Sequence, residues 1–202
     1  MPAYKIGSGD LTNLPFLEKV AHKNKPIILS TGMADLAEVK EAVDSITRIN
    51  KKIILLHCTT SYPCPLEDVN LRAMGSLRSR FNVPVGYSDH TQGILVPVIA
   101  VAMGAEIIEK HFTLDKNLAG PDHIASLSPE ELTEMVVRIR STEKIMGSFE
   151  KKPTKNERNI IKIVRKSIVA KKDIAKGEKI TADMLCIKRP GNGIEPKYKD
   201  KI

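Results

Sequence analysis

Five short apolar runs, each ending in small, polar or ionisable residues, constrain the fold of this chain more than any other feature. They are Ala3–Gly9, Pro26–Gly32, Ile53–Thr60, Pro84–His90 and Glu106–Thr113. A buried parallel strand is a nearly unbroken apolar run, and α/β enzymes keep their chemistry at the carboxyl ends of such strands. The runs therefore predict a site assembled from several strand ends.

Segments with helical period alternate with these runs. In the segment 35–46, apolar residues recur on one helical face, whereas 65–81 fits a helix with an irregular start and 94–103 is almost wholly apolar. The best-marked helix opens with Ser128 as N-cap, Pro129 at the first position and Glu131 completing a capping box, and Gly147 offers its end.

Strand and helix alternating through five cycles predict right-handed βαβ units and a parallel sheet. Units of about 30 residues are typical of a (β/α)₈, or TIM, barrel. The chain starts almost at its first strand, so we expect either a smaller open sheet or the last five βα units of a barrel without its first three strands.

The pattern changes after Gly147. The basic, polar segment 150–166 reads as a linker, although Ile160, Ile161 and Val164 are spaced as in a short helix. From Ser167 the sequence favours short strands, with a turn at Lys176–Glu178. We therefore expect a partial barrel domain over residues 1–149, a linker over 150–166, and an incomplete β-rich domain over 167–202.

Composition limits the partners. The net charge is +8, but aromatic residues are only 4% and tryptophan is absent, so base-stacking platforms are scarce and nucleic acid is disfavoured. A solvated linker or an anionic small substrate accounts better for the charge. No apolar stretch is long enough for a membrane span, no secretory signal is visible, and three cysteines without paired spacing suggest reduced thiols, all of which favour a cytoplasmic protein.

Two histidines are the sharpest candidates for chemistry. His90 and His111 fall at the ends of adjacent predicted strands, each beside a carboxylate, Asp89 and Glu109, that is close enough in sequence to orient it. Two imidazole ligands would leave coordination positions open for a substrate. Either histidine alone reads more simply as a hydrogen-bonded loop residue, and the pairing favours function.

A second group of residues suits an anion. Hydroxyls, backbone amides and a lysine at strand–helix junctions bind phosphate well. The residues of this kind are Lys5, Ser8, Ser30, Thr31, Gly32, Thr59, Thr60 and Ser88. Ordinary turn and cap chemistry uses the same residue types. His57 and Cys58 fit a buried strand equally well and receive no role.

Loops rich in turn formers carry three further candidates. Tyr62 precedes Pro63, Asp122 follows Pro121, and Arg189 precedes Pro190. By pattern alone, these side chains are as well explained as solvent-facing turn residues as they are by contact with a polar ligand.

Taken in order, the motifs resemble the sialic acid synthase family, which includes the N-acetylneuraminate and N,N′-diacetyllegionaminate synthases. The segments that carry the resemblance are 4–9, 28–33, 57–59, 86–91, 109–115 and 120–123. The tail, through 168–177 and 188–193, is similar to the antifreeze-like (SAF) domain of that family. The resemblance covers nearly the whole chain and implies a fragment that lacks the first barrel strands and ends within the SAF domain.

The resemblance implies a transferase that joins phosphoenolpyruvate to an N-acylated mannose-type sugar such as N-acetylmannosamine, forming a nine-carbon 2-keto acid and phosphate. It implies Mn²⁺ on His90 and His111, with Glu109 contributing to catalysis. The remaining matched positions imply contacts with the substrates. These are Lys5, Ser8, Ser30 and Ser88 for phosphoenolpyruvate, Tyr62 and Asp122 for the sugar, Arg189 for the N-acyl group, and Thr60 for substrate binding without a named group.

In that family the SAF domain caps the barrel of the partner subunit, which implies a domain-swapped homodimer. Two other readings remain open. A different metal-dependent barrel enzyme, an aldolase or hydrolase, would explain the histidine pair but not the SAF-like tail. A non-catalytic fragment or pseudoenzyme would bind sugar or phosphoenolpyruvate without turnover.

Overall fold

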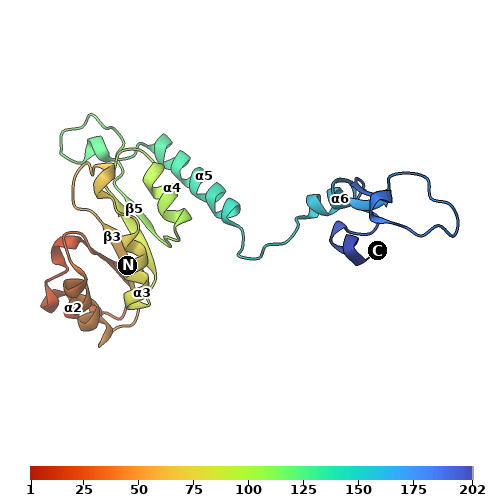
Figure 1. Cartoon of the computed structure of the whole chain (residues 1–202). Helices are drawn as coiled ribbons and strands as arrows, with labels where there is room; N and C mark the ends of the chain where they lie inside the picture. The colour runs from red at the N-terminus through yellow and green to blue at the C-terminus, as the bar shows by residue number, and fades with distance from the viewer. Residues whose placement is uncertain (202) are drawn as a thin grey trace. The chain divides into compact units, whose positions relative to one another are not determined.

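A computed structural model of the chain describes residues 1–201. They form two compact units, residues 1–147 and the residues from 148 onward (Figure 1), and each is described by itself. The helix α6 of the second unit, Lys155–Val164, lies within the segment expected as a linker.

The first unit contains a parallel sheet of five strands, in the order in which they occur along the chain. The strands are β1 (Tyr4–Ile6), β2 (Ile27–Ser30), β3 (Ile53–Cys58), β4 (Val85–Asp89) and β5 (Ile108–Lys110). Each coincides with one of the five apolar runs, so that prediction is confirmed. Neighbouring strands that are parallel, in register and joined by helices are βαβ units, the repeating element of a barrel.

Five helices connect or follow the strands. They are α1 (Leu14–Ala21), α2 (Leu36–Thr47), α3 (Ala73–Phe81), α4 (Leu95–Ala102) and α5 (Pro129–Met146). Asp35 caps α2 and Ser128 caps α5, each in a complete capping box, and Gly147 ends α5 with a positive φ of 58°. The irregular start predicted before α3 is a short 3₁₀ turn, Leu66–Asp68.

Side chains alternate along each strand, so the two faces of the sheet carry different residue types. Every second residue faces the helices, and these side chains form the hydrophobic core with α1 to α4. Its strand members include Ile27, Leu29, Ile53, Leu55, Val85 and Tyr87. The residues between them face the other side of the sheet, and toward the strand ends they are polar. Burying the apolar face against helices is the main stabilising contribution in such a unit.

The sheet is curled as in a half-barrel. Lys5 on β1 and Glu109 on β5 belong to the two edge strands, yet Lys5 Nζ lies 3.0 Å from Glu109 Oε2. Side chains of two edge strands separated by three others can meet only if the sheet curves around their common face. That concave face is therefore the interior of the partial barrel.

The second unit is small. It consists of α6, an antiparallel pair of strands, β6 (Ser167–Ala170) and β7 (Leu185–Lys188), and 3₁₀ turns at Ala182–Met184 and Pro196–Lys201. The turn at Lys176–Glu178 is present between β6 and β7, with Gly177 at a φ of 87°, in the middle of the segment 171–181. The predicted turn between short strands is therefore confirmed, and a hydrogen bond from Lys171 N to Met184 O closes the segment that contains it.

No helix in the described part of the chain is long and apolar enough to cross a membrane.

Candidate active site

His90 and His111 lie side by side at the carboxyl ends of β4 and β5. Their ring centroids are 5.3 Å apart, with the ring planes nearly perpendicular. The ring of Tyr62 packs against both, 4.1 Å from the ring of His90 and 5.5 Å from that of His111. The parallel register of β4 and β5 brings the two histidines together, as the sequence predicts.

A hydrogen bond sets the tautomer of His90, and a nearby carboxylate favours the same tautomer in His111. His90 Nδ1 lies 2.9 Å from the carbonyl oxygen of Thr59, which can only accept, so Nδ1 carries the hydrogen. His111 Nδ1 faces Asp122 Oδ2 at 3.6 Å, an acceptor that favours the same tautomer. In both rings the Nε2 lone pair is left free, which is the arrangement of a metal-binding histidine held by an outer partner.

The partners of the histidines differ from the expected ones. Asp89 was expected to orient His90, but its carboxylate bonds Lys110 and Thr91 on the other face of the sheet and makes no direct contact with the ring. The carboxylate of Glu109 pairs with Lys5 rather than with His111. Backbone carbonyls and loop residues cannot be assigned as partners from strand patterns, which is why Thr59 escaped prediction.

Cys58 is a residue that sequence reasoning left without a role. Its thiol lies 3.8 Å from His90 Nδ1 and 3.7 Å from Ser8 Oγ. Burial alone would raise the pKa of this thiol, but hydrogen bonds from His90, Ser8 and Ser88 outweigh burial and lower the pKa. Burial conversely lowers the pKa of His90, and the contacts with Cys58 and Thr59 raise it overall.

The pKa of Tyr62 is affected by the charged groups of the same region. Burial raises the pKa of its phenol, and the nearby groups of Cys58, Asp122 and Glu109 raise it further. Its hydroxyl therefore remains protonated at neutral pH and can donate a hydrogen bond to a ligand. The histidines, Tyr62, Asp122 and Glu109 thus share one electrostatic environment.

The hydroxyl residues cluster around a glycine at the end of β2. Ser8 Oγ accepts a hydrogen bond of 2.9 Å from Gly32 N. A Cβ at Gly32 would lie 2.3 Å from Thr60 Oγ1, 2.8 Å from Ser8 Oγ and 3.2 Å from Cys58 Sγ. Only glycine allows these side chains to approach the chain so closely.

Two further serines face the concave side of the sheet. Ser30 is 2% exposed, and its hydroxyl has no hydrogen-bond partner in the described part of the chain. Ser88 is 3% exposed and contacts Cys58. An unpaired buried hydroxyl is costly, so Ser30 is well suited to a polar ligand.

The loop after β5 carries Asp122. Thr113 Oγ1 lies 2.8 Å from His123 Nδ1, and Ser126 Oγ donates to the carbonyl of Asp122. These bonds hold the backbone on both sides of Asp122. Arg189 lies in the second unit, where it is exposed at the end of β7, so its assignment stays a prediction.

The set of side chains that could bind a metal ion is small. Residues 1–201 contain no group of three or more histidine, cysteine or acidic side chains placed to hold one ion. Two imidazoles with free Nε2 atoms remain, which fits a divalent ion that completes its coordination with substrate and water.

The comparisons with known proteins agree with this geometry. Residues 1–151 match the NeuB family, and residues 165–202 match the SAF domain. The chain belongs to the NeuB family. The predicted sequence resemblance is thereby confirmed, and so is the fold class, five βα units of a TIM-type barrel followed by a SAF domain.

Relatives of this chain include sialic acid synthase-type enzymes. The chain is 56% identical to the N,N′-diacetyllegionaminic acid synthase of Campylobacter jejuni over 194 residues, covering 95% of this chain and 58% of that protein. It is 42% identical to human N-acetylneuraminate-9-phosphate synthase, covering 93% of this chain and 53% of the human protein. The chain thus spans somewhat more than half the length of these relatives.

A solved structure gives the same result. The N-acetylneuraminic acid synthetase of Leptospira borgpetersenii, in complex with citrate, superposes with a TM-score of 0.75 at 41% sequence identity. The match covers 80% of this chain and 56% of that one. The partial barrel seen here therefore recurs in a NeuB-type enzyme.

Proposed function

We propose that this NeuB chain carries the larger part of the active site of a sialic acid synthase-type transferase. The reaction joins C3 of phosphoenolpyruvate to the aldehyde carbon C1 of an open-chain N-acylated mannose-type sugar. Water adds at C2, phosphate leaves, and a nine-carbon 2-keto acid results. N-acetylmannosamine and its 6-deoxy-4-acetamido relative are the two candidate sugars.

The observation that carries the proposal is the meeting of two kinds of site on one concave face. The histidine pair with free Nε2 atoms lies at the ends of β4 and β5, and Lys5 of β1 reaches across the sheet to Glu109 of β5. A histidine pair alone would suit many hydrolases. A lysine and buried hydroxyls around it suit a second, anionic substrate.

In this proposal the anion-binding residues hold phosphoenolpyruvate. Lys5 supplies a positive charge, the amide of Gly32 and the hydroxyl of Ser8 supply polar contacts, and the unpaired hydroxyl of Ser30 gains a partner. Ser88 completes the group. Desolvation of this concave face would strengthen each of these interactions.

The sugar is assigned to the other side of the site. The protonated phenol of Tyr62 and the carboxylate of Asp122 would bind sugar hydroxyls, with Thr60 at the boundary between the substrates. Arg189 of the SAF domain is proposed to bind the N-acyl group. Glu109 is proposed to take part in proton transfer, since its carboxylate lies beside Lys5.

His90 and His111 would hold a divalent ion, proposed as Mn²⁺. When bound, such an ion supplies a Lewis acid that polarises the sugar aldehyde. The histidine side chains are prepared for it because Thr59 and Asp122 hold the Nδ1 sides of the rings. We further propose a domain-swapped homodimer, in which SAF domains are exchanged, acting in the cytoplasm.

The experiment is mass spectrometry of a reaction mixture. The chain, extended upstream to a complete barrel, is incubated with phosphoenolpyruvate, Mn²⁺ and each candidate sugar. A product with the mass of one sugar plus pyruvate, with equimolar phosphate, supports the proposal and identifies the sugar. No product from a folded, Mn²⁺-loaded dimer overturns it and leaves a binding module.

His111→Ala in the same protein tests the metal assignment. We expect loss of Mn²⁺-dependent turnover with the fold retained, because His111 is a half-buried residue at a strand end rather than part of the core. An unchanged rate at saturating Mn²⁺ would contradict the assignment. His22→Ala, a change on the surface of α1, is the matched control.

A further inference from the structure

A buried ion pair lies behind the two histidines. Lys110 Nζ and Asp89 Oδ2 are 2.6 Å apart, and their side chains are 2% and 0% exposed. Every other ion pair found among residues 1–201 joins side chains that are each about a third exposed or more. This pair is therefore exceptional in the chain, and neither group faces the concave side.

The pair occupies one defined register position. Asp89 of β4 is directly opposite Lys110 of β5, and the residue that follows each of them is His90 or His111. Side chains alternate across a sheet. The ion pair thus joins the two strands on the helix-covered face, one residue before each histidine turns to the concave face.

The pair belongs to a small network around His90. Asp89 Oδ1 accepts a hydrogen bond from Thr91 N and Oδ2 accepts one from Thr91 Oγ1, both 3.1 Å long. Lys110 also donates to the carbonyl oxygen of Thr91. Asp89 and Thr91 flank His90, so the network fixes the backbone on both sides of that residue and ties it to β5.

The strand that carries His111 needs such a tie. β5 is three residues long, its residues are only half-buried, and it has a strand neighbour on one side only among the described residues. A pair of apolar residues would hold two strands together as well as a buried ion pair does, without the cost of removing two charges from water. The charged pair is explained better by the specific distance and register that it imposes.

We infer that the Asp89–Lys110–Thr91 network is a positioning device that sets the separation and ring orientation of His90 and His111. The inference rests on the proposed function in one respect, that the two rings serve a metal ion. The ring orientation itself is a property of the chain and is measurable without any metal.

The test compares two double variants of the 202-residue chain. Asp89→Asn with Lys110→Met removes both charges at nearly constant volume, so no buried charge is left unpaired. Glu134→Gln with Arg138→Met makes the same change in an exposed pair on α5 and is the control. Ring ¹⁵N resonances of the histidines report the tautomer of each ring, and Mn²⁺ binding is followed by the electron paramagnetic resonance signal of the free ion.

In the native chain and the control we expect His90 and His111 each to be one tautomer, with hydrogen on Nδ1. In the Asp89–Lys110 variant we expect His111 to average between tautomers, because its ring is no longer held beside Asp122. Mn²⁺ affinity should fall by up to about 10- to 100-fold, the loss seen when a metal ligand is no longer held by its outer partner. Native ring signals and affinity in this variant would overturn the inference and leave the pair a purely structural element.

Two readouts separate this inference from the proposed function. If the native chain has ordered rings but binds no Mn²⁺, the metal assignment fails, and the ring resonances alone decide the positioning role. If the double variant does not fold, Thr91→Val takes its place, because it removes one hydrogen bond from Asp89 and leaves the charges paired. The same ring signals should then shift by a smaller amount, and unchanged signals would overturn the inference.

Discussion

The two units of this chain reach order by different means. The NeuB unit has a hydrophobic core shared by five strands and four helices, whereas Met184 is the one buried apolar side chain found among residues 148–201. In α6 no side chain is buried, although its sequence is amphipathic. The first unit is held by burial, and the second by capping, short strand pairing and turns.

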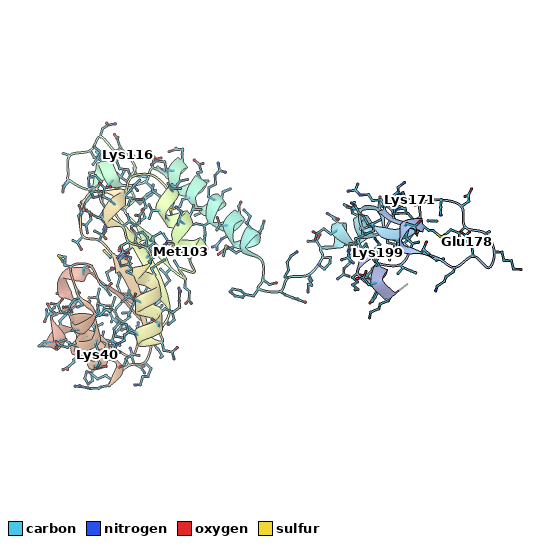
Figure 2. The ribbon with its side chains drawn as sticks, viewed as in Figure 1. Lys40, Met103, Lys116, Lys171, Glu178 and Lys199 are labelled. Carbon is cyan, nitrogen blue, oxygen red and sulfur yellow. The ribbon has the colours of Figure 1, made fainter. Side chains whose placement is uncertain are left out.

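The two units also differ in net charge. Residues 1–147 contain 16 lysines and arginines against 17 acidic residues, while residues 148–202 contain 16 against seven. The whole excess of positive charge therefore lies in the second unit, on whose surface Lys171 and Lys199 lie (Figure 2). A small unit with little core and like charges is more sensitive to salt and to local changes than a packed sheet is.

Removing a core side chain should separate the units most clearly. Leu55→Ala, at a position of β3 with 0% exposure, should cost about 2–5 kcal/mol. Hydrogen-exchange mass spectrometry should show faster exchange throughout residues 1–147 and unchanged exchange in the second unit. Ile187→Ala in β7, which is 40% exposed, should disturb only the second unit and by less. Loosening of both units by Leu55→Ala would mean that they fold as one cooperative block.

Glycine substitutions test close packing in each unit. A Cβ at Gly86 would lie 2.3 Å from the carbonyl oxygen of Ile107, and one at Gly191 would lie 2.5 Å from Arg165 Cβ. Alanine at either position should cost about 1–3 kcal/mol, each in its own unit. Gly75→Ala on α3 is the control, since nothing lies within 4 Å, and it should stabilise by about 0.5–1 kcal/mol. Thermal unfolding measures all three; equal Tm values for Gly86→Ala and Gly75→Ala would contradict the packing argument.

Removing a helix cap should lower the free energy of unfolding by a similar amount in both units, but its effect on helicity should differ. Asp35→Ala and Thr154→Ala each remove the side-chain acceptor of a capping box, at a cost of about 1 kcal/mol. Because α2 is packed into the core, its helicity should persist, whereas α6 should lose much of its helicity. Backbone chemical shifts distinguish these results. Asp35→Asn and Thr154→Ser retain a cap and should change little, and a persistent α6 without its cap would show that packing supports it.

Protonation of His57 at acidic pH should destabilise the first unit but not the second. Burial lowers the pKa of His57, with partial compensation from the carbonyls of Val69 and Asn70. Near pH 6 the unfolded chain therefore binds more protons at His57 than the folded chain does. The contribution of neutral His57 to the free energy of unfolding is fully present above the ordinary histidine pKa of about 6.5 and decreases as the pH falls below it. His57→Gln should flatten this part of the pH dependence, measured by denaturant unfolding at pH 5 to 8. The second unit has no histidine, and an equal acid effect there would point to another group.

Much of the first unit was predictable because its pattern is repeated. The alternation of apolar runs and amphipathic segments located all five strands, and the Ser128–Glu131 capping box located the start of α5. His90 and His111 were predicted to meet because parallel register brings residues after adjacent strands together. These inferences rely on periodicity and topology, which a single sequence contains.

The rest of the site depends on contacts that periodicity does not encode. The thiol of Cys58, the carbonyl of Thr59 and the Asp89–Lys110 pair are defined by curvature and by alternation to a particular face. Asp89 is an example. It precedes His90 directly in the sequence, and successive residues of a strand face opposite sides of the sheet, so its carboxylate lies away from the His90 ring. In the second unit the sequence predicted the turn at Lys176–Glu178 but not the bounds of β6 and β7, since the segment between them carries little periodic signal.

The contact between Lys5 and Glu109 has a consequence for the order of folding. It joins the first and last strands of the sheet, about a hundred residues apart, so it can form only after every strand between them has found its register. Contacts of such large sequence separation form slowly, since the intervening chain must be ordered first. The Lys5–Glu109 contact, in which we propose that Lys5 also binds an anion, is therefore expected to be among the last features to assemble. Partly folded forms of the unit would have strands and helices before this face of the sheet was complete.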